Sequence, residues 1–148
     1  MADPYNLGRF VQAQASNYDD AISELSAGKK RTHWMWYIFP QLEGLGNSAM
    51  AHRYSIKSEA EAGAYLNHET LGPRLIECAS AVANTTGKSA HDIFGSPDEM
   101  KLHSSATLFA HVPDNPVFQE ILDKYFGGKP DKKTLELIAL KAPRIASR

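Results

Sequence analysis

One short segment of this sequence brings together side chains that could bind a small planar ligand and act on it. The segment runs from Thr32 to Ser48 and reads THWMWYIFPQLEGLGNS. It contains both tryptophans of the chain, Trp34 and Trp36, with His33 directly before them. Indole rings stack on planar groups, and an imidazole exchanges protons near neutral pH. The segment therefore suits a ligand site, although an aromatic cluster in the hydrophobic core would have the same composition.

The spacing of the two tryptophans limits how they could share a ligand. Residues two apart on a helix point about 200° away from each other, whereas in an extended segment they lie on one side. We expect at least one of Trp34 and Trp36 to contact a ligand if the site exists. Tyr37 and Phe39 are expected in the core.

Anion-binding groups are also predicted near this segment. The run Gly44-Leu45-Gly46-Asn47-Ser48 precedes a predicted helix and could offer backbone N–H groups to a phosphate or carboxylate. A simple turn followed by a helix cap has the same sequence, and neither a P-loop lysine nor a complete dinucleotide fingerprint is present. The candidate ligand-binding residues here are Gly44 and Gly46. Further candidates on helices, where surface ion pairs are common, are Arg53, Arg74 and Lys101.

Three residues are candidates for acid–base catalysis. His33 lies in the aromatic segment and His103 in a predicted central helix, and either could act as a general acid or base. Glu77 could orient a histidine or an arginine, although a pair with Arg74, three residues earlier on the same helix, explains it without a function. The remaining histidines show no HExxH or Cys/His ligand spacing, so the sequence predicts neither a metal site nor a cofactor.

The length and composition predict one ordinary globular domain over residues 1–148. The net charge of −1 provides no overall field to attract nucleic acid or an anionic membrane. The stretch from Asp123 to Arg148 has seven Lys/Arg against three Asp/Glu, but these charges are spread out. They predict a solvated surface rather than an anionic partner.

Two further features bear on compartment. Cys78 is the single cysteine and lies in LIECASAV, which predicts a buried small residue on a helix and excludes an intramolecular disulfide. The first residues, MADPYNLGRF, lack a basic region followed by an apolar one, and no apolar run approaches about 18 residues. We therefore expect a cytoplasmic protein with no membrane association.

Helical periodicity and helix punctuation recur along the whole chain, whereas alternating strand patterns do not. We predict an all-α fold of about seven or eight short helices around one core, and not a long up-down bundle. WMWYIF is assigned to a short helix or irregular segment because Pro40 ends it and no strand partner is evident. The predicted helices cover 7–14, 18–27, 49–54, 59–67, 70–84, 97–111, 116–126 and 132–140, with a short helical turn at 89–94.

Several helix starts carry cap signals. Asn17 and Ser48 are predicted caps, and Ser58 with Glu61 forms a predicted capping box. The strongest signal is Ser96-Pro97-Asp98-Glu99, with a cap, a proline in the first turn and a capping glutamate. The helix that it opens has apolar residues around most of its circumference and small residues at its centre. It is therefore expected at the centre of the fold.

Three stretches of the sequence resemble one known family. THWMWYIFPQLEGLGNS, then AHRY at 51–54 and LGPRLIEC at 71–78, resemble the bacterial domain-of-unknown-function family numbered 1810, which is sometimes labelled calpastatin-like. The resemblance extends over nearly the full length and implies a multihelical fold with short helices. It implies no activity and no catalytic residues. The calpastatin label does not suit this sequence, since calpastatin segments are disordered and this chain has core-forming helices.

Three functions follow from these features. The first is an enzyme or enzyme-like protein that binds a small anionic ligand with a planar group, such as a nucleotide or an ADP-ribose-linked compound. The second is a non-catalytic interaction or regulatory module that uses Trp34 and Trp36 as its contact surface. The third, nucleic-acid binding through the basic C-terminal stretch, is disfavoured by the near-neutral charge and the absence of a recognition motif.

Overall fold

The structure of this protein is a computed structural model that describes residues 2–141. This part of the chain forms ten helices and no strand, which confirms the all-α prediction with more helices than the expected seven or eight. The helices are α1 (Gly8–Gln14), α2 (Tyr18–Ser26), α3 (Met35–Ile38), α4 (Ala49–Arg53), α5 (Glu59–Asn67), α6 (Leu71–Asn84), α7 (Ala90–Phe94), α8 (Asp98–Ala110), α9 (Val117–Tyr125) and α10 (Lys132–Lys141).

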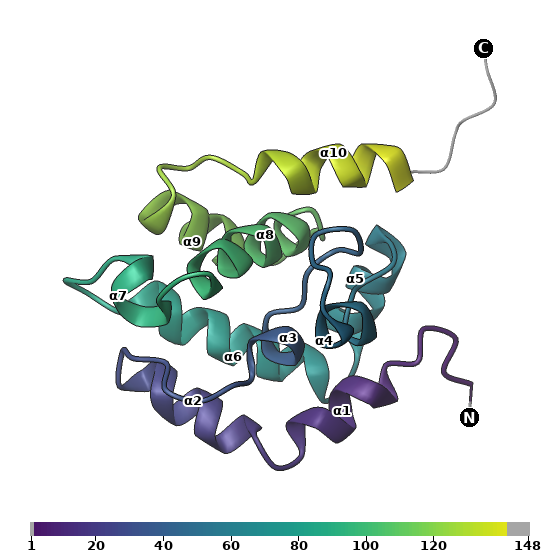
Figure 1. Ribbon diagram of the computed structural model, residues 1–148, viewed down its shortest axis with the longest axis horizontal. Coiled ribbons are helices and arrows are strands. Elements are labelled where there is room, and N and C mark those ends of the chain that lie inside the picture. The colour runs from purple at the N-terminus through teal and green to yellow at the C-terminus, as the bar shows by residue number, and fades with distance from the viewer. Residues whose placement is uncertain (1, 142–148) are drawn as a thin grey trace.

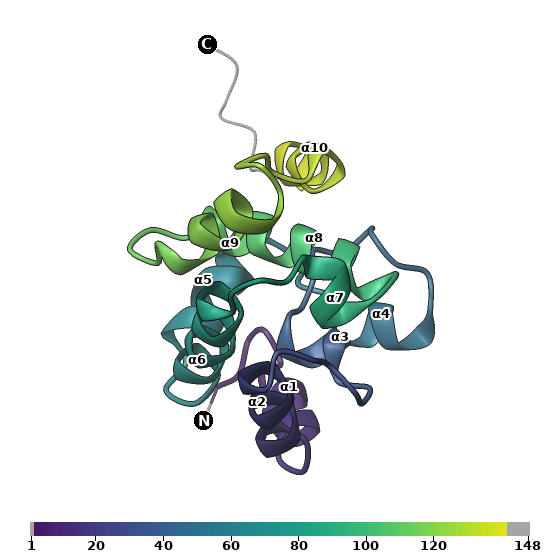
Figure 2. The same ribbon diagram turned by 90° about the vertical axis from the view of Figure 1, so that its left-hand side faces the viewer.

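The two longest helices, α6 and α8, organise the fold. Helix α6 packs against α2, α5 and α9, and α8 packs against α5, α7, α9 and α10. In Figure 1, α10 lies along one edge of the molecule above α8, and α1 and α2 lie along the opposite edge; Figure 2 shows the same order from the side. The prediction that the helix after Pro97 is central is confirmed, because every residue of α8 from Ser104 to Phe109 is buried.

A continuous chain of aromatic contacts joins helices that are distant in sequence. The ring of Phe10 on α1 lies 5.0 Å from that of Tyr65 on α5. Tyr65 lies 5.6 Å from Phe109 on α8, and Phe109 lies 5.5 Å from Phe118 on α9. Edge and tilted contacts of this kind add about 0.5–1.5 kcal/mol per pair to the burial of the rings. They fix the packing of helices too short to be stable alone.

Serine side chains cap three of the helices. Ser48 Oγ accepts the N–H of Ala51, and Ser89 with Asp92 forms a complete capping box at α7. Ser58 caps α5 as predicted, but Glu61 does not close the box. Its carboxylate is buried and instead accepts the N–H of Lys57 at 2.9 Å and the guanidinium of Arg9 at 2.8 Å.

The start of α8 differs from the prediction. The helix begins at Asp98, and the hydroxyl of Ser96 donates to the carboxylate of Glu99 at 2.6 Å instead of accepting a backbone N–H. That carboxylate also contacts the ring of His91 at 2.9 Å, so it faces α7. Asn17 lies at the predicted position before α2, yet its amide donates to the carbonyl of Ala13 and does not cap the helix.

Two other expectations concern membrane-spanning helices and the basic C-terminal stretch. No helix between residues 2 and 141 is long and apolar enough to cross a membrane. Arg144 and Arg148, which contribute to the basic C-terminal stretch, lie outside the described residues.

Candidate ligand-binding cavity

The aromatic segment is fixed to α2 by one buried carboxylate. The side chain of Glu24 accepts hydrogen bonds from the indole N–H of Trp34 at 2.9 Å and from the backbone N–H groups of Arg31 at 2.6 Å and Thr32 at 2.9 Å. The Thr32 hydroxyl donates to its other oxygen at 2.6 Å. Burial would raise the pKa of Glu24, but these four bonds to the charged form prevail and lower it to about 2.

The two tryptophans point in different directions because the segment turns into a short helix. Trp34 is 0% exposed and belongs to the core. Helix α3 buries Met35, Tyr37 and Ile38 and leaves Trp36 half-buried. The two indoles therefore do not share one side, as they could in an extended segment. Of the two tryptophans, only Trp36 reaches a cavity.

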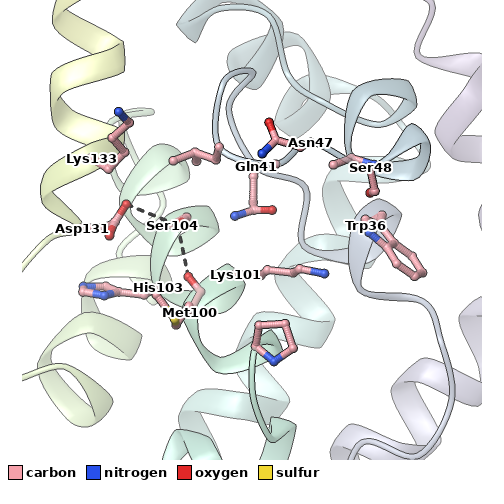
Figure 3. Close-up of a pocket in the computed structure, with 14 residues that line it drawn as sticks. Trp36, Gln41, Asn47, Ser48, Met100, Lys101, His103, Ser104, Asp131 and Lys133 are labelled. Carbon is pink, nitrogen blue, oxygen red and sulfur yellow. Dashed lines mark hydrogen bonds between the residues drawn. The ribbon is translucent and has the colours of Figure 1, made fainter.

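The cavity that contains Trp36, which we call the Trp36 cavity, has a volume of about 460 Å³. Its walls come from α3 and the following loop, the start of α4, the first turns of α8 and the start of α10 (Figure 3). The residues that line it are Trp36, Gln41, Leu45, Gly46, Asn47, Ser48, Ala51, Pro97, Met100, Lys101, His103, Ser104, Asp131 and Lys133.

Backbone pairing positions the loop on one wall. Leu42 and Ile56 form an isolated parallel bridge, in which the Ile56 N–H donates to the Gln41 carbonyl and the Glu43 N–H to the Ile56 carbonyl, both at 2.8 Å. Gly46 lies so close to α4 that an added Cβ would be 2.6 Å from that of Ala51. The small size of Gly46 therefore lets the loop fold onto α4 at the cavity.

A lysine lies over the indole of Trp36. Lys101 Nζ is 4.9 Å from the centre of the Trp36 ring and 3.5 Å from one oxygen of Asp98. The other oxygen of Asp98 binds Lys30 at 2.9 Å, and Lys30 Nζ lies 5.0 Å from the ring of Trp34. One carboxylate thus pairs with two lysines, each over one tryptophan, and of the two lysines Lys101 lines the cavity.

The opposite end of the cavity is rich in hydrogen-bond acceptors. Asp131 precedes α10, and its Oδ2 accepts the N–H of Thr134 at 3.0 Å and the Thr134 hydroxyl at 2.5 Å. The hydroxyl of Ser104 is 3.3 Å from the same oxygen and 3.1 Å from the carbonyl of Met100. The Asp131 N–H donates to the hydroxyl of Thr107 at 2.8 Å, which fixes this end to α8.

His103 lines the wall but is engaged elsewhere. Its ring stacks on Phe126 with centres 4.1 Å apart and planes 2° apart. Nε2 lies 2.8 Å from the carbonyl of Lys129, which can only accept, so Nε2 carries the proton. In Figure 3 the ring is turned away from Lys101 and Trp36. His103 therefore supports the loop that leads to Asp131.

Several predicted residues lie outside the Trp36 cavity. His33 is exposed, and the guanidinium of Arg53 lies 5.6 Å from the ring of Tyr54. Gly44 has a φ of 107° and lines a separate small cavity that shares Trp36 and Gly46 with the larger one. The structure therefore brings together Trp36, Gly46, Lys101 and His103 from the predicted set.

Arg74 and Glu77 form a different cluster, between α2 and α6. They are not an ion pair with each other: Glu77 accepts the hydroxyl of Tyr18, and the Arg74 guanidinium lies 4.9 Å from the Tyr18 ring and 3.4 Å from Gln14 Oε1. Burial and the bond to Glu77 both raise the pKa of Tyr18. Both side chains are accounted for by contacts that join the first two helices to α6.

Reasoning from the sequence missed half of the cavity's polar groups. Asn47 and Ser48 belong to the glycine-rich run, which the sequence assigns either to an anion-binding loop or to a turn followed by a helix cap, but their side chains are not among the candidates. Gln41, Ser104, Asp131 and Lys133 carry no local signal for a ligand site. Asp131 is recognisable from sequence solely as a residue before a helix. The described residues include no group of three or more potential metal ligands.

Comparison with known proteins places this chain in a family. A crystal structure at 1.38 Å of a conserved hypothetical protein from Mycobacterium tuberculosis has 54% sequence identity and a TM-score of 0.91, over 93% of this chain and 99% of that one. No curated protein matches the sequence. A family model described as "Protein of unknown function (DUF1810)" matches residues 4–138, which confirms the resemblance found in the sequence. The chain therefore belongs to the DUF1810 family.

Proposed function

We propose that the Trp36 cavity binds a small anionic ligand with a planar group. The planar group stacks on Trp36 and the anionic group lies beside Lys101. The single observation that carries this proposal is the position of Lys101 Nζ, 4.9 Å from the ring centre of a half-buried tryptophan that lines a cavity. A cation and an aromatic face within one wall recognise a ligand that is both charged and flat.

The size and lining of the cavity support a nucleotide-sized ligand. Ligand sites in proteins have volumes of about 300–1,000 Å³, and about 460 Å³ lies within that range. Leu45, Pro97 and Met100 provide apolar surface, and the amides of Gln41 and Asn47 provide polar groups that can fix an orientation. Stacking of a base on an aromatic side chain contributes about 1–3 kcal/mol.

The proposal assigns binding and no reaction. Of the three residues predicted for acid–base chemistry, His33 and Glu77 lie outside the cavity, and His103 donates its Nε2 proton to the carbonyl of Lys129. A hydrolase or transferase acting on a nucleotide derivative would need a further group that accepts or donates a proton at the ligand.

The cavity is favoured over an interaction surface made by both tryptophans. Such a surface requires the two indoles to be exposed side by side, and Trp34 is 0% exposed with its N–H bound to Glu24. Trp36 and the exposed Met100 line the same cavity and can contact one ligand there.

The test measures binding of three probes by titration calorimetry and thermal shift. ADP carries both a planar base and a negative charge, adenosine carries the base alone, and pyrophosphate carries the charge alone. We expect ADP to bind more tightly than either part. At about 100 times its dissociation constant a ligand stabilises the folded protein by about 2.7 kcal/mol.

Matched variants locate the binding. Trp36→Leu and Lys101→Met should each weaken ADP binding by about tenfold or more, the loss expected for a stacking or charged contact. Lys124→Met is the control, because Lys124 Nζ also lies over an aromatic ring, 5.7 Å from that of Tyr125, outside the cavity. ADP binding that Trp36→Leu and Lys101→Met leave unchanged would contradict the proposal.

A further inference from the structure

We propose that the ligand of the Trp36 cavity carries a sugar-like pair of hydroxyl groups at the end remote from its planar group, and that Asp131 recognises them. This inference rests on the proposed function and names its ligand class more closely. The class is a nucleoside diphosphate that bears a terminal sugar.

The cavity has two chemically different ends. In Figure 3, Trp36 and Ser48 lie on one side of the view, Asp131, Ser104 and Lys133 on the other, and Lys101 and Gln41 between them. An aromatic face and a cation suit a base followed by a phosphate. The far end presents the carboxylate of Asp131 and the hydroxyl oxygen of Ser104 beside the cation of Lys133 (Figure 3). Two acceptors of this kind suit neither a base face nor a phosphate.

Asp131 retains acceptor capacity after its structural bonds are counted. Its Oδ2 accepts hydrogen bonds from Thr134 and Ser104, whereas its Oδ1 accepts none from any residue within 2–141. A carboxylate oxygen can accept two hydrogen bonds and has no proton to donate at neutral pH. It repels phosphate and binds hydroxyl or amino groups, and carboxylates that bind ribose hydroxyls are an established device in nucleotide sites.

Ser104 provides a second acceptor at the same end. Its single proton serves either the carbonyl of Met100 or Asp131, so a lone pair remains on an oxygen of a residue that lines the cavity. Asp131 and Ser104 thus present two acceptors on neighbouring elements, and each can accept a hydrogen bond from one of two neighbouring hydroxyl groups of the ligand.

Lys133 provides a second cation at the cavity, at the same end as Asp131 (Figure 3). It lines the cavity beside Asp131, so cations border the acceptor end as well as the aromatic one. Lys101 and Lys133 together suit a diphosphate that spans the space between them. The order along the ligand is then planar group, diphosphate and hydroxylated group.

The experiment compares ADP-ribose with ADP by calorimetry on the full chain and on Asp131→Asn. Asparagine caps helices as well as aspartate does, so the start of α10 is retained while one carboxylate oxygen is replaced by an NH₂ donor. We expect the unchanged protein to bind ADP-ribose about tenfold or more tightly than ADP, the gain expected for a hydrogen bond to a charged group. Asp131→Asn should remove this preference and leave the affinity for ADP equal or higher.

Controls separate recognition from folding. Asp123→Asn changes an exposed aspartate on α9 that binds Gln119 outside the cavity, and it should keep the preference for ADP-ribose. Ser104→Ala leaves Asp131 charged and should reduce the preference partially. Thermal unfolding of each variant identifies any loss of fold.

The outcomes distinguish the two proposals. Equal binding of ADP and ADP-ribose by the unchanged protein, or a preference that Asp131→Asn leaves intact, overturns the assignment of Asp131 and leaves the proposed function standing. Binding of neither probe overturns both.

Discussion

The indole N–H of Trp34 donates to Oε1 of Glu24 at 2.9 Å, and both groups are buried. This bond joins α2 to the segment that carries Trp36, and the same carboxylate receives the two backbone N–H groups that precede the aromatic run. The position of Trp36 in its cavity therefore depends on a charge located one helix away.

We predict that Glu24→Gln destabilises the folded protein by about 2–4 kcal/mol at neutral pH, because charged hydrogen bonds are lost and buried donors are left without their acceptor. Urea unfolding followed by circular dichroism measures the change. The matched control is Glu136→Gln, at an exposed position on α10. A Glu24→Gln loss no greater than that of the control would show that the buried carboxylate does not hold the segment.

The lowered pKa of Glu24 predicts that the free energy of unfolding depends on pH. The pKa of Glu24 falls from 4.5 to about 2 on folding, so its contribution to stability is complete above about 4.5 and is lost as the pH falls towards about 2. The difference in unfolding free energy between the unchanged protein and Glu24→Gln should shrink over that interval. A difference that is constant with pH would contradict the assigned cause.

Two helical glycines should respond oppositely to alanine. A Cβ on Gly72 would lie 2.1 Å from the backbone oxygen of Leu66, whereas a Cβ on Gly63 would meet nothing within 4 Å. Gly72→Ala should cost at least about 2 kcal/mol because the backbone must move, and Gly63→Ala should stabilise by about 0.5–1 kcal/mol through helix propensity. Thermal and urea unfolding of both variants provide the comparison. Similar stabilities for the two would refute the close approach of α5 and α6.

The two tryptophans should differ in fluorescence quenching. Trp34 is 0% exposed, whereas Trp36 is half-buried in an open cavity beside the cation of Lys101, which attracts iodide. Iodide should quench one component of the emission, and Trp36→Phe should remove that component while the protected emission of Trp34 remains. A Trp36→Phe protein that iodide still quenches as strongly would place Trp34 at the surface.

Cys78 should be inert until the protein unfolds. The thiol is buried on α6, and burial raises its pKa to about 12, so the reactive thiolate is scarce at neutral pH. A thiol reagent such as dithionitrobenzoate should label the native protein far more slowly than the protein in denaturant. Comparable rates under the two conditions would contradict the burial.

Much of the fold could be predicted from the sequence because its signals are local. Cys78 was predicted to be a buried residue on a helix and lies on the buried face of α6, and Ser48 was predicted as the cap that it forms at α4. These patterns depend on residues three or four apart, which one turn of helix brings together. The predictions failed at Glu61, whose carboxylate binds Arg9 from α1, and at Ser96, whose hydroxyl donates to the side chain of Glu99 instead of accepting a backbone N–H.

The candidate site was only partly predictable. The sequence by itself determined that the aromatic segment, Gly46, Lys101 and His103 are notable, since residue type and spacing identify them. Only the tertiary structure decided that Trp36 and not Trp34 reaches a cavity, and that Asp131 and Lys133 line it. The reason is physical: the packing of α10 against α8 and the direction of α3 depend on contacts between residues far apart in the chain, and no local pattern encodes which helix ends meet.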